Sequence, residues 1–274
     1  MRDLELKRRA LDDILSGLGS VLVAFSGGVD SACLAVRAHQ VLGRRALAVT
    51  ADSPSLADEQ RQAALGLARQ FGFGHRVIAT FELEDPRYLR NAADRCYYCK
   101  SELFAQLGPL AAREGFAHVA YGLIADDLTD YRPGRRAADE AGARSPLAEA
   151  GLTKDDVRAL SREWGLPTWD RPASPCLSSR VPYGTAVTPE VLRQVEAAEA
   201  GVRRLGFREL RVRHLGRSAR VEIAPAELSR LDDPAVRAAA VAAVQAAGYA
   251  EVVLDSQGYR RGRLNDALRV VAST

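Results

Sequence analysis

The chain has 274 residues, of which 47% are hydrophobic, and its net charge is +3. This length suggests one large or two modest domains, and the composition is sufficient for a buried core of ordinary size. So small a positive charge does not indicate a nucleic-acid-binding protein, no apolar run reaches membrane-spanning length, and residues 1–5 do not begin a signal peptide, so we expect a cytoplasmic protein.

The first half of the chain alternates between short apolar runs and segments with helical character. This alternation predicts an α/β fold in which parallel strands form a doubly wound sheet with helices between them. We expect strands at 21–25, 46–50, 75–79 and 118–121, and helices at 1–19, from about residue 32, at 56–71 and at 101–114.

The stretch that joins the first expected strand to its helix reads Ser26-Gly27-Gly28-Val29-Asp30-Ser31. Two glycines let the backbone approach a ligand closely, and free N–H groups at a helix start attract anions. The two serines add hydroxyl donors, whereas the aspartate suits an anion site only if it holds a metal ion or caps the turn. A tight strand–helix turn without a ligand is the alternative interpretation.

This pattern is neither a Walker loop, which ends in Lys and Ser or Thr, nor a dinucleotide fingerprint, which needs a third glycine. Thr50 and Gly122 end the second and fourth expected strands. Ligands of open α/β sheets bind at the carboxyl ends of the strands, so both residues join the candidate ligand site.

Two further stretches of the first half are polar or irregular. Residues 86–100 are expected to link the third strand to the helix at 101–114, with Ser101 as N-cap. Residues 122–134 form a long loop that contains Asp126, Asp127 and Asp130. Loops of this length in compact domains tend to be functional, and a solvated charged loop is the alternative.

A proline-rich stretch at 171–187 interrupts regular structure. We therefore expect a first domain at 1–170, a loop or linker at 171–187, and a small α/β domain at 188–274. In the first domain, Thr153 opens a capping box with Asp156. The small domain should begin with a helix capped by Thr188, and should contain strands at 209–214, 219–223 and 251–254 and helices at 188–205, 225–231 and 234–247.

Three cysteines are candidates for chemistry. Cys176 lies in the proline-rich loop near Arg180, and a guanidinium charge favours the thiolate, which is the nucleophilic and metal-binding form. Cys96 and Cys99 form a C-x-x-C pair, which suits half of a zinc site, a redox pair or one side of an iron–sulfur site. Three thiolates on a cubane cluster leave one iron open to an added ligand. An inert loop cysteine is the alternative for Cys176, and Cys33, among apolar neighbours, is expected to be a buried structural thiol.

Several motifs, taken in order, resemble the LarE family. This family consists of PP-loop ATP pyrophosphatases that act as sulfur transferases and make the nickel-pincer nucleotide of lactate racemase. The resemblance covers nearly the whole chain. The motifs are Ser26–Ser31, Cys96–Lys100, Tyr131–Gly134, Arg144–Leu147 and Ser174–Arg180.

The resemblance implies a PP-loop fold and a reaction that uses ATP and Mg²⁺. A carboxylate of pyridinium-3,5-biscarboxylic acid mononucleotide is adenylated, and sulfur then replaces its oxygen to give a thiocarboxylate. The resemblance assigns Mg²⁺ to Asp30 and the sulfur-bearing role to Cys176. It assigns nucleotide binding to Ser26, Gly27, Gly28, Val29, Asp30, Ser31, Thr50 and Gly122.

The family offers two sources of sulfur. Members with one cysteine in the loop sacrifice its sulfur and end with dehydroalanine. Members with three cysteines carry a [4Fe–4S] cluster whose open iron delivers a hydrosulfide. Cys96, Cys99 and Cys176 match the three-cysteine arrangement and favour the cluster, while the sacrificial route stays open.

Charged residues near and beyond the loop are candidates for substrate binding. Arg180, Arg211 and Arg213 suit a substrate phosphate, because the guanidinium fork binds phosphate in a bidentate way. A solvated basic face is the alternative for the last two. Glu199 and Glu222 are candidates for a metal-binding patch.

Other functions remain alternatives at this stage. One is another PP-loop enzyme, such as a tRNA thiolase or an enzyme like NAD or GMP synthetase, and another is a nucleotide-binding sensor without catalysis. We expect a small-molecule nucleotide substrate and no nucleic-acid or membrane partner. We also expect a homo-oligomer, because the LarE family often forms symmetric assemblies.

Overall fold

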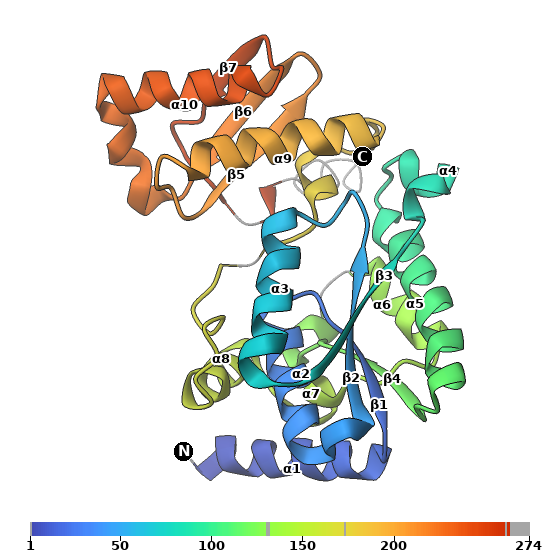
Figure 1. The fold of residues 1–274 in the computed structure, drawn as a ribbon. Helices are drawn as coiled ribbons and strands as arrows, with labels where there is room; N and C mark the ends of the chain where they lie inside the picture. The colour runs from blue at the N-terminus through green and yellow to red at the C-terminus, as the bar shows by residue number, and fades with distance from the viewer. Residues whose placement is uncertain (1, 130–131, 173, 261, 264–274) are drawn as a thin grey trace. The chain divides into compact units, whose positions relative to one another are not determined.

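The computed structural model describes residues 2–129, 132–172, 174–260 and 262–263 (Figure 1). Asp130 and Tyr131, which the sequence analysis includes in a polar loop and a motif, lie outside the described residues. The chain divides into two compact units. The N-terminal unit lies within Met1–Glu82 and Cys96–Ser174, and the C-terminal unit lies within Leu83–Arg95 and Pro175–Thr274.

The N-terminal unit is built on a parallel sheet of the kind predicted. Its strand order is β3-β2-β1-β4, and every neighbouring pair is parallel. The carboxyl ends of the strands therefore share one edge, as in other doubly wound sheets. The strands are β1 (Val21–Ala24), β2 (Ala46–Asp52), β3 (Gly74–Ala79) and β4 (His118–Tyr121).

Helices cover both faces of this sheet. Val21 and Val23 of β1 point into a core formed with α1, α2, α3 and α8, and Leu22 and Ala24 point into a second core formed with α5. Side chains of a strand alternate between faces, so a strand buried on both faces is a continuous apolar run. The helices of this unit are α1 (Arg2–Leu18), α2 (Val29–Leu42), α3 (Asp58–Phe71), α5 (Arg95–Glu114), α6 (Pro133–Glu140), α7 (Pro146–Glu149) and α8 (Lys154–Glu163).

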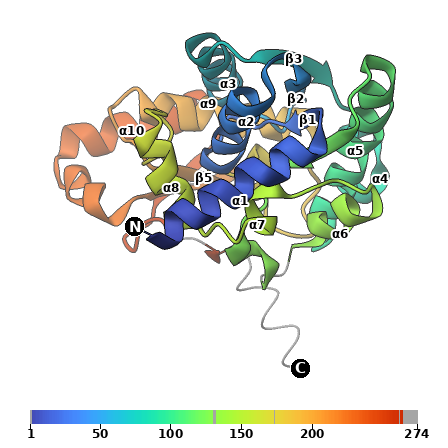
Figure 2. The same ribbon diagram turned by 90° about the horizontal axis from the view of Figure 1, so that it is seen from below.

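Helix α1 closes the first of these cores, and Figure 2 shows it lengthwise. Its leucines at positions 11, 15 and 18 are buried in this core, where α1 packs against α2 and α7. Burial of each leucine stabilises the fold by about 1.5–3 kcal/mol relative to exposure. Among the helices that the structure describes, none is long and apolar enough to cross a membrane.

The predicted helix at 101–114 begins earlier than expected. Helix α5 starts at Arg95, so Cys96 and Cys99 lie in its first turns and not in a linking segment. Ser101 is not an N-cap, because its hydroxyl donates to the carbonyl of Tyr97, four residues back inside the helix (2.9 Å). No glycine or proline separates Arg95 from Ser101, so nothing in the backbone stops the helix there.

The C-terminal unit contains a three-stranded sheet with the order β5-β6-β7. Strands β5 (Leu210–Leu215) and β6 (Ser218–Ile223) form an antiparallel hairpin, and β7 (Glu251–Leu254) pairs parallel with β6. Helices α9 (Pro189–Arg203) and α10 (Pro234–Ala246) bury their apolar sides on this sheet, and α4 (Pro86–Leu89) also belongs to the unit. Thr188 caps α9 as predicted, by accepting from Val191 N (3.3 Å). The helix expected at 225–231 is a 3₁₀ helix at 225–232.

Candidate functional site

The loop from Ser26 to Ser31 follows β1 at the carboxyl edge of the sheet and leads into α2. Gly27 has φ +71°, and a Cβ there would lie 3.1 Å from the Cβ of Ala64, so the loop requires glycine at this position. No side chain caps α2 at Gly28. The first N–H groups of the helix therefore receive no side-chain cap from Gly28, and such groups can donate to an anion.

Two hydroxyls shape this loop from within. The Oγ atoms of Ser26 and Ser31 are 3.1 Å apart, and the backbone N–H of Ser26 donates to Ser31 Oγ (3.2 Å). Ser31 is buried, whereas Ser26 is exposed. Ser31 therefore stabilises the loop, and the Ser26 hydroxyl is the one on its open side.

Gly122, at the end of β4, packs directly on the start of α2. A Cβ on Gly122 would lie 2.9 Å from Ser31 N and 3.1 Å from the carbonyl carbon of Asp30. The structure therefore places Gly122 against the loop, and the contact explains why no larger residue fits.

Thr50 lies close to the loop but is engaged by the protein. It is 1% exposed, its hydroxyl donates to the carbonyl of Phe25 (2.8 Å), and the same oxygen is 2.8 Å from His75 Nε2. Burial lowers the pKa of His75, which keeps its ring neutral and able to share this contact. Thr50 thus joins three neighbouring strands just below the candidate site.

Asp30 has a partner that the sequence analysis missed. Lys154 Nζ lies 2.7 Å from both Asp30 carboxylate oxygens, and the two side chains are 33% and 25% exposed. Lys154 is the first residue of α8, whose predicted capping box between Thr153 and Asp156 is confirmed. Its backbone N–H donates to the Asp126 carboxylate (2.6 Å), so the acidic loop after β4 holds the start of α8.

One feature of the sequence could have identified Lys154. A cation in the first turn of a helix opposes the helix dipole, so a nearby anion favours a lysine at this position. The anion is Asp30, at the start of another helix. A cation and a carboxylate meet here beside a phosphate-type loop.

The neighbouring Asp127 is buried and forms an ion pair with Arg132 (2.6 Å). Burial raises the pKa of Asp127, and the charge of Arg132 opposes that shift. The described part of the 122–134 loop is thus fixed by specific contacts.

A second missed group holds the loop after β2. The Glu82 carboxylate is 3% exposed and accepts from the hydroxyls of Ser53 (2.5 Å) and Ser55 (2.6 Å). Because this loop also leaves the carboxyl edge of the sheet, Glu82 shapes the rim of the candidate ligand site.

Cys96 and Cys99 lie one helical turn apart on α5, with Cys96 exposed and Cys99 half-buried. Residues three apart share a helix face, so the two thiols are neighbours. Gly134 packs against the same turn, because a Cβ there would lie 3.2 Å from the Cys96 carbonyl and 2.8 Å from Lys100 Cγ. The described residues of the motif at 131–134 therefore contact the motif at 96–100.

The remaining cysteine of this unit is fully buried. Cys33 is 0% exposed in α2, and burial raises the pKa of its thiol to about 12. It is the structural thiol that the sequence predicts.

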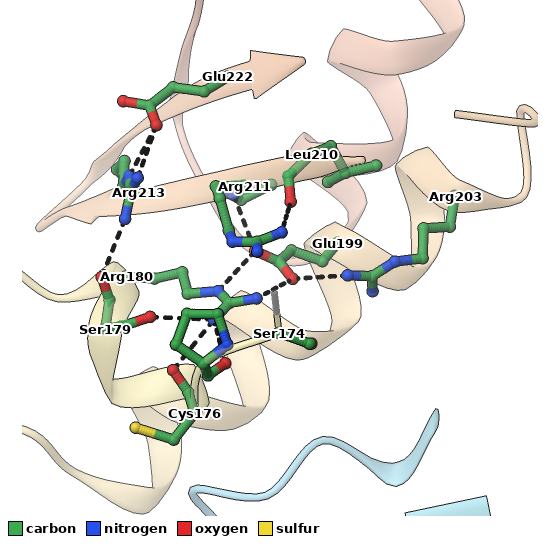
Figure 3. Close-up of polar contacts among 12 residues, drawn as sticks. Ser174, Cys176, Ser179, Arg180, Glu199, Arg203, Leu210, Arg211, Arg213 and Glu222 are labelled. Atoms are coloured by element: carbon green, nitrogen blue, oxygen red, sulfur yellow. Dashed lines mark hydrogen bonds and ion pairs between the residues drawn. The ribbon is translucent and has the colours of Figure 1, made fainter. Parts of the chain in front are cut away.

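Cys176 lies in the C-terminal unit, half-buried, just before a 3₁₀ turn at 177–180 (Figure 3). Arg180 at the end of this turn donates from Nη1 to the carbonyls of Pro175 (2.6 Å) and Cys176 (3.0 Å). Its Nε and Nη2 donate to the two carboxylate oxygens of Glu199 (2.8 and 3.0 Å). Arg180 therefore lies close to Cys176, as predicted, and it contacts the backbone carbonyls of Pro175 and Cys176.

Glu199 is nearly fully buried and balances two guanidinium groups, since Arg203 Nη2 also donates to it (3.0 Å). Burial disfavours its charge, but the charge of Arg180 and its hydrogen bonds outweigh burial and lower the pKa of the Glu199 carboxyl. Glu222 is equally buried and pairs with Arg213 (2.8 Å). Both carboxylates predicted as a metal patch are thus engaged by arginines.

Arg211 and Arg213 both lie on β5. Arg213 Nη1 donates to the carbonyl of Ser179 (2.9 Å), whereas Arg211 Nη1 donates to the carbonyl of Leu210 (2.6 Å). Arg211 lies over the ring of Tyr259 and is 3% exposed, and its burial lowers the pKa of its guanidinium. The three predicted arginines therefore gather around the Cys176 turn, with their donors largely turned to protein groups.

Residues 83–95 also support this turn, which the sequence did not indicate. Asn91, at φ +55° and 0% exposed, donates to the carbonyls of Val181 (3.2 Å) and Pro182 (2.8 Å). The Tyr88 hydroxyl is 2.6 Å from Ser178 Oγ, and Arg95 donates to the Ser178 carbonyl (3.0 Å).

Within the described ranges, no three side chains of the His, Cys, Asp and Glu types gather closely enough to hold a metal ion.

Comparison with known proteins identifies near-full-length relatives, although no protein-family model matches. The chain is 44% identical over 97% of its length to an uncharacterized protein of Synechocystis sp., of which it covers 99%. It is 41% identical over 98% of its length to the pyridinium-3,5-bisthiocarboxylic acid mononucleotide synthase of Lactiplantibacillus plantarum, of which it covers 97%. It is also 28% identical over 67% of its length to one subunit of the glutamine-hydrolyzing GMP synthase of Pyrococcus furiosus, covering 63% of that protein.

Proposed function

This chain belongs to the LarE family of sulfur transferases, and from that premise we propose that it converts a carboxylate of pyridinium-3,5-biscarboxylic acid mononucleotide into a thiocarboxylate at the expense of ATP. The acceptor is inferred from the name of the Lactiplantibacillus relative, whose product is the bisthiocarboxylic acid. The observation that carries the proposal is the combination, in one chain, of the loop at 26–31 with the Cys176 turn.

The first half-reaction is adenylation. A carboxylate oxygen of the acceptor attacks the α-phosphorus of ATP, the bond from that phosphorus to the bridging oxygen breaks, and pyrophosphate leaves. The start of α2, which no side chain caps, supports this step, because the first N–H groups of a helix can donate to a phosphate.

Mg²⁺ fits the donor groups of this loop. The Asp30 carboxylate and the Ser26 hydroxyl are hard oxygen ligands, and Asp30 is partly exposed. When bound, the ion would neutralise phosphate charge as pyrophosphate leaves. Lys154 holds Asp30 in the structure, and its ammonium is a suitable phosphate ligand once the carboxylate turns to a metal.

The second half-reaction is sulfur transfer. A sulfur nucleophile attacks the acyl carbon, and the bond to AMP breaks. In the sacrificial route the nucleophile is the Cys176 thiolate; a base then removes the Cα proton of Cys176, the Cβ–S bond breaks with its electron pair on sulfur, and dehydroalanine remains. In the other route an external hydrosulfide attacks, and Cys176 keeps its sulfur.

We favour the second route because it gives Cys96 and Cys99 a part in the chemistry. Their thiols share one helix face, which suits two ligands of an iron–sulfur cluster, and the family resemblance assigns Cys176 as the third. A [4Fe–4S] cluster, when bound, would offer an open iron for the hydrosulfide.

The proposal is tested by incubating the anaerobically purified chain with ATP, Mg²⁺, sulfide and the biscarboxylic acceptor. We expect pyrophosphate and AMP in equal amounts, and an acceptor in which sulfur has replaced oxygen by mass spectrometry. Xanthosine monophosphate with ammonia serves as the control acceptor, since GMP synthases are among the relatives. Pyrophosphate release that depends on the control acceptor, or on no acceptor, would contradict the proposed function.

A further inference from the structure

Arg180 is almost fully buried, with its side chain only 2% exposed. All three of its guanidinium nitrogens are engaged by protein acceptors. Nη1 donates hydrogen bonds to the carbonyls of Pro175 and Cys176 and to the hydroxyl of Ser179. Nε and Nη2 donate to the carboxylate of Glu199 (Figure 3). A guanidinium in this state has little surface left for a substrate phosphate.

The acceptor side of this pair is anchored in the rigid part of the unit. Glu199 lies on α9, and the backbone N–H of Val212 on β5 donates to it (3.0 Å). The Glu199 carboxylate is therefore fixed by a helix and a strand, and it holds the planar guanidinium in one orientation. The remaining edge of that plane faces the carbonyls of Pro175 and Cys176.

A second arginine supports the same turn from the hairpin. Arg213 of β5 is held by Glu222 of β6 and donates to the Ser179 carbonyl. Two buried carboxylates thus orient two arginines onto the backbone of one turn. This arrangement determines where the Cys176 thiol lies relative to the rest of the unit.

Stability alone does not account for this arrangement. A buried ion pair contributes little net stability compared with apolar groups of the same volume, because both charges lose their hydration. A geometric requirement gives another reason for keeping the pair. Here the pair defines the backbone position of the residue whose thiol the chemistry needs.

We propose that Arg180 is a positioning residue that holds Cys176 in place for sulfur transfer by binding the carbonyls of Pro175 and Cys176, and that it is not a ligand of the substrate phosphate. The inference rests on the proposed function. It predicts that Arg180 matters after adenylation, whereas a phosphate ligand would matter from substrate binding onward.

The test uses Arg180→Lys, which keeps the charge but cannot reach Glu199 and the carbonyls together. We expect an unchanged apparent KM for the acceptor and unchanged pyrophosphate release in the first turnover. The yield of thiocarboxylate per pyrophosphate should fall by about 10- to 100-fold, the cost of a misplaced reacting group. Hydrogen exchange of peptides that cover 175–181 should become faster, while the β5–β6 hairpin keeps its protection.

Arg203→Lys is the matched control, because Arg203 pairs with the same Glu199 carboxylate from within α9 itself, one helical turn away. It should leave the yield and the exchange of 175–181 close to wild type. Glu199→Asp serves as a second variant if Arg180→Lys does not fold, since it withdraws the carboxylate by one methylene and should reproduce the low yield.

Two results would overturn the inference. A higher KM for the acceptor in Arg180→Lys, with a normal yield per pyrophosphate, would make Arg180 a substrate ligand. Wild-type yield and wild-type exchange in that variant would remove any positioning role. Failure of the proposed function itself is recognised separately, because wild-type protein would then produce no thiocarboxylate at all.

Discussion

Lys154 Nζ lies 2.7 Å from each carboxylate oxygen of Asp30 and joins the start of α8 to the start of α2. The two residues are 124 positions apart in the sequence. Helix starts carry partial positive charge, so two helix starts that converge create a positive potential. The Asp30 carboxylate and the Lys154 ammonium neutralise each other at this point. A nucleotide with its metal ion would satisfy both groups separately.

Replacing Lys154 by Met should reduce acceptor-dependent pyrophosphate release by about 10- to 100-fold. The loss corresponds to one charge-assisted hydrogen bond of about 1.5–3 kcal/mol. Lys7→Met is the matched control. Lys7 lies on α1, and its Nζ pairs with the carboxylate of Asp156 on α8 (2.8 Å). Equal rates in Lys154→Met and wild type would exclude a role for this ammonium in phosphate binding.

Replacing Asp30 by Ala should abolish adenylation, with a drop of at least about 100-fold, because a bound metal supplies several kcal/mol of charge stabilisation. The side chain is partly exposed, so the fold should survive, as circular dichroism would show. Titration of Mg²⁺ in the assay separates a weakened metal site from a lost one. A variant with the normal rate at the normal Mg²⁺ concentration would show that Asp30 is not the metal ligand.

Replacing Gly122 by Ala should impair ATP binding without touching any candidate catalytic group. The added methyl would lie 2.9 Å from Ser31 N, and backbone there cannot move without shifting the start of α2. Calorimetric titration with ATP measures the effect. Gly66→Ala on α3 is the control, since a Cβ at Gly66 meets nothing within 4 Å and should leave affinity unchanged.

Glu199 should make the stability of the C-terminal unit depend on acid pH. Its pKa is lowered in the folded state, so the folded state binds fewer protons there than the unfolded state, and stability rises with pH through that range. The contribution of Glu199 to stability is fully present above the ordinary glutamate pKa of about 4.3, and it is lost as pH falls through the lower pKa of the folded state. Glu199→Gln should be less stable near neutrality and should lose less stability between about pH 5 and pH 3, as measured by denaturant unfolding. An identical pH slope in both proteins would contradict this account.

The fate of Cys176 distinguishes the two sulfur sources. If a cluster is held, anaerobic protein should contain about four irons per chain and should lose them in Cys96→Ser or Cys99→Ser. After several turnovers with sulfide, the intact mass should be unchanged. Iron-free protein whose mass falls by one H₂S, with dehydroalanine at position 176, would instead support the sacrificial route. Cys33→Ser is the control and should change neither result, because that thiol is buried in α2.

Local patterns in the sequence were sufficient to predict the parallel sheet, the loop at 26–31 and the capped starts of α8 and α9. Each depends on neighbours along the chain: an apolar run makes a strand buried on both faces, glycines make a tight turn, and a hydroxyl caps the helix that follows it. The chemistry of the guanidinium group was sufficient to propose Arg180, Arg211 and Arg213 as phosphate ligands, and that role stays a prediction.

Tertiary structure alone decided what those groups contact. No local rule pairs Lys154 with Asp30 or buries Arg180 against Glu199, and none assigns residues 83–95 to the C-terminal unit. A buried charge is tolerated only where an opposite charge and hydrogen-bond acceptors converge on it, and that convergence is a property of the folded chain. For this reason the sequence predicted which side chains are candidates for the chemistry, and the fold determined which protein groups each of them contacts.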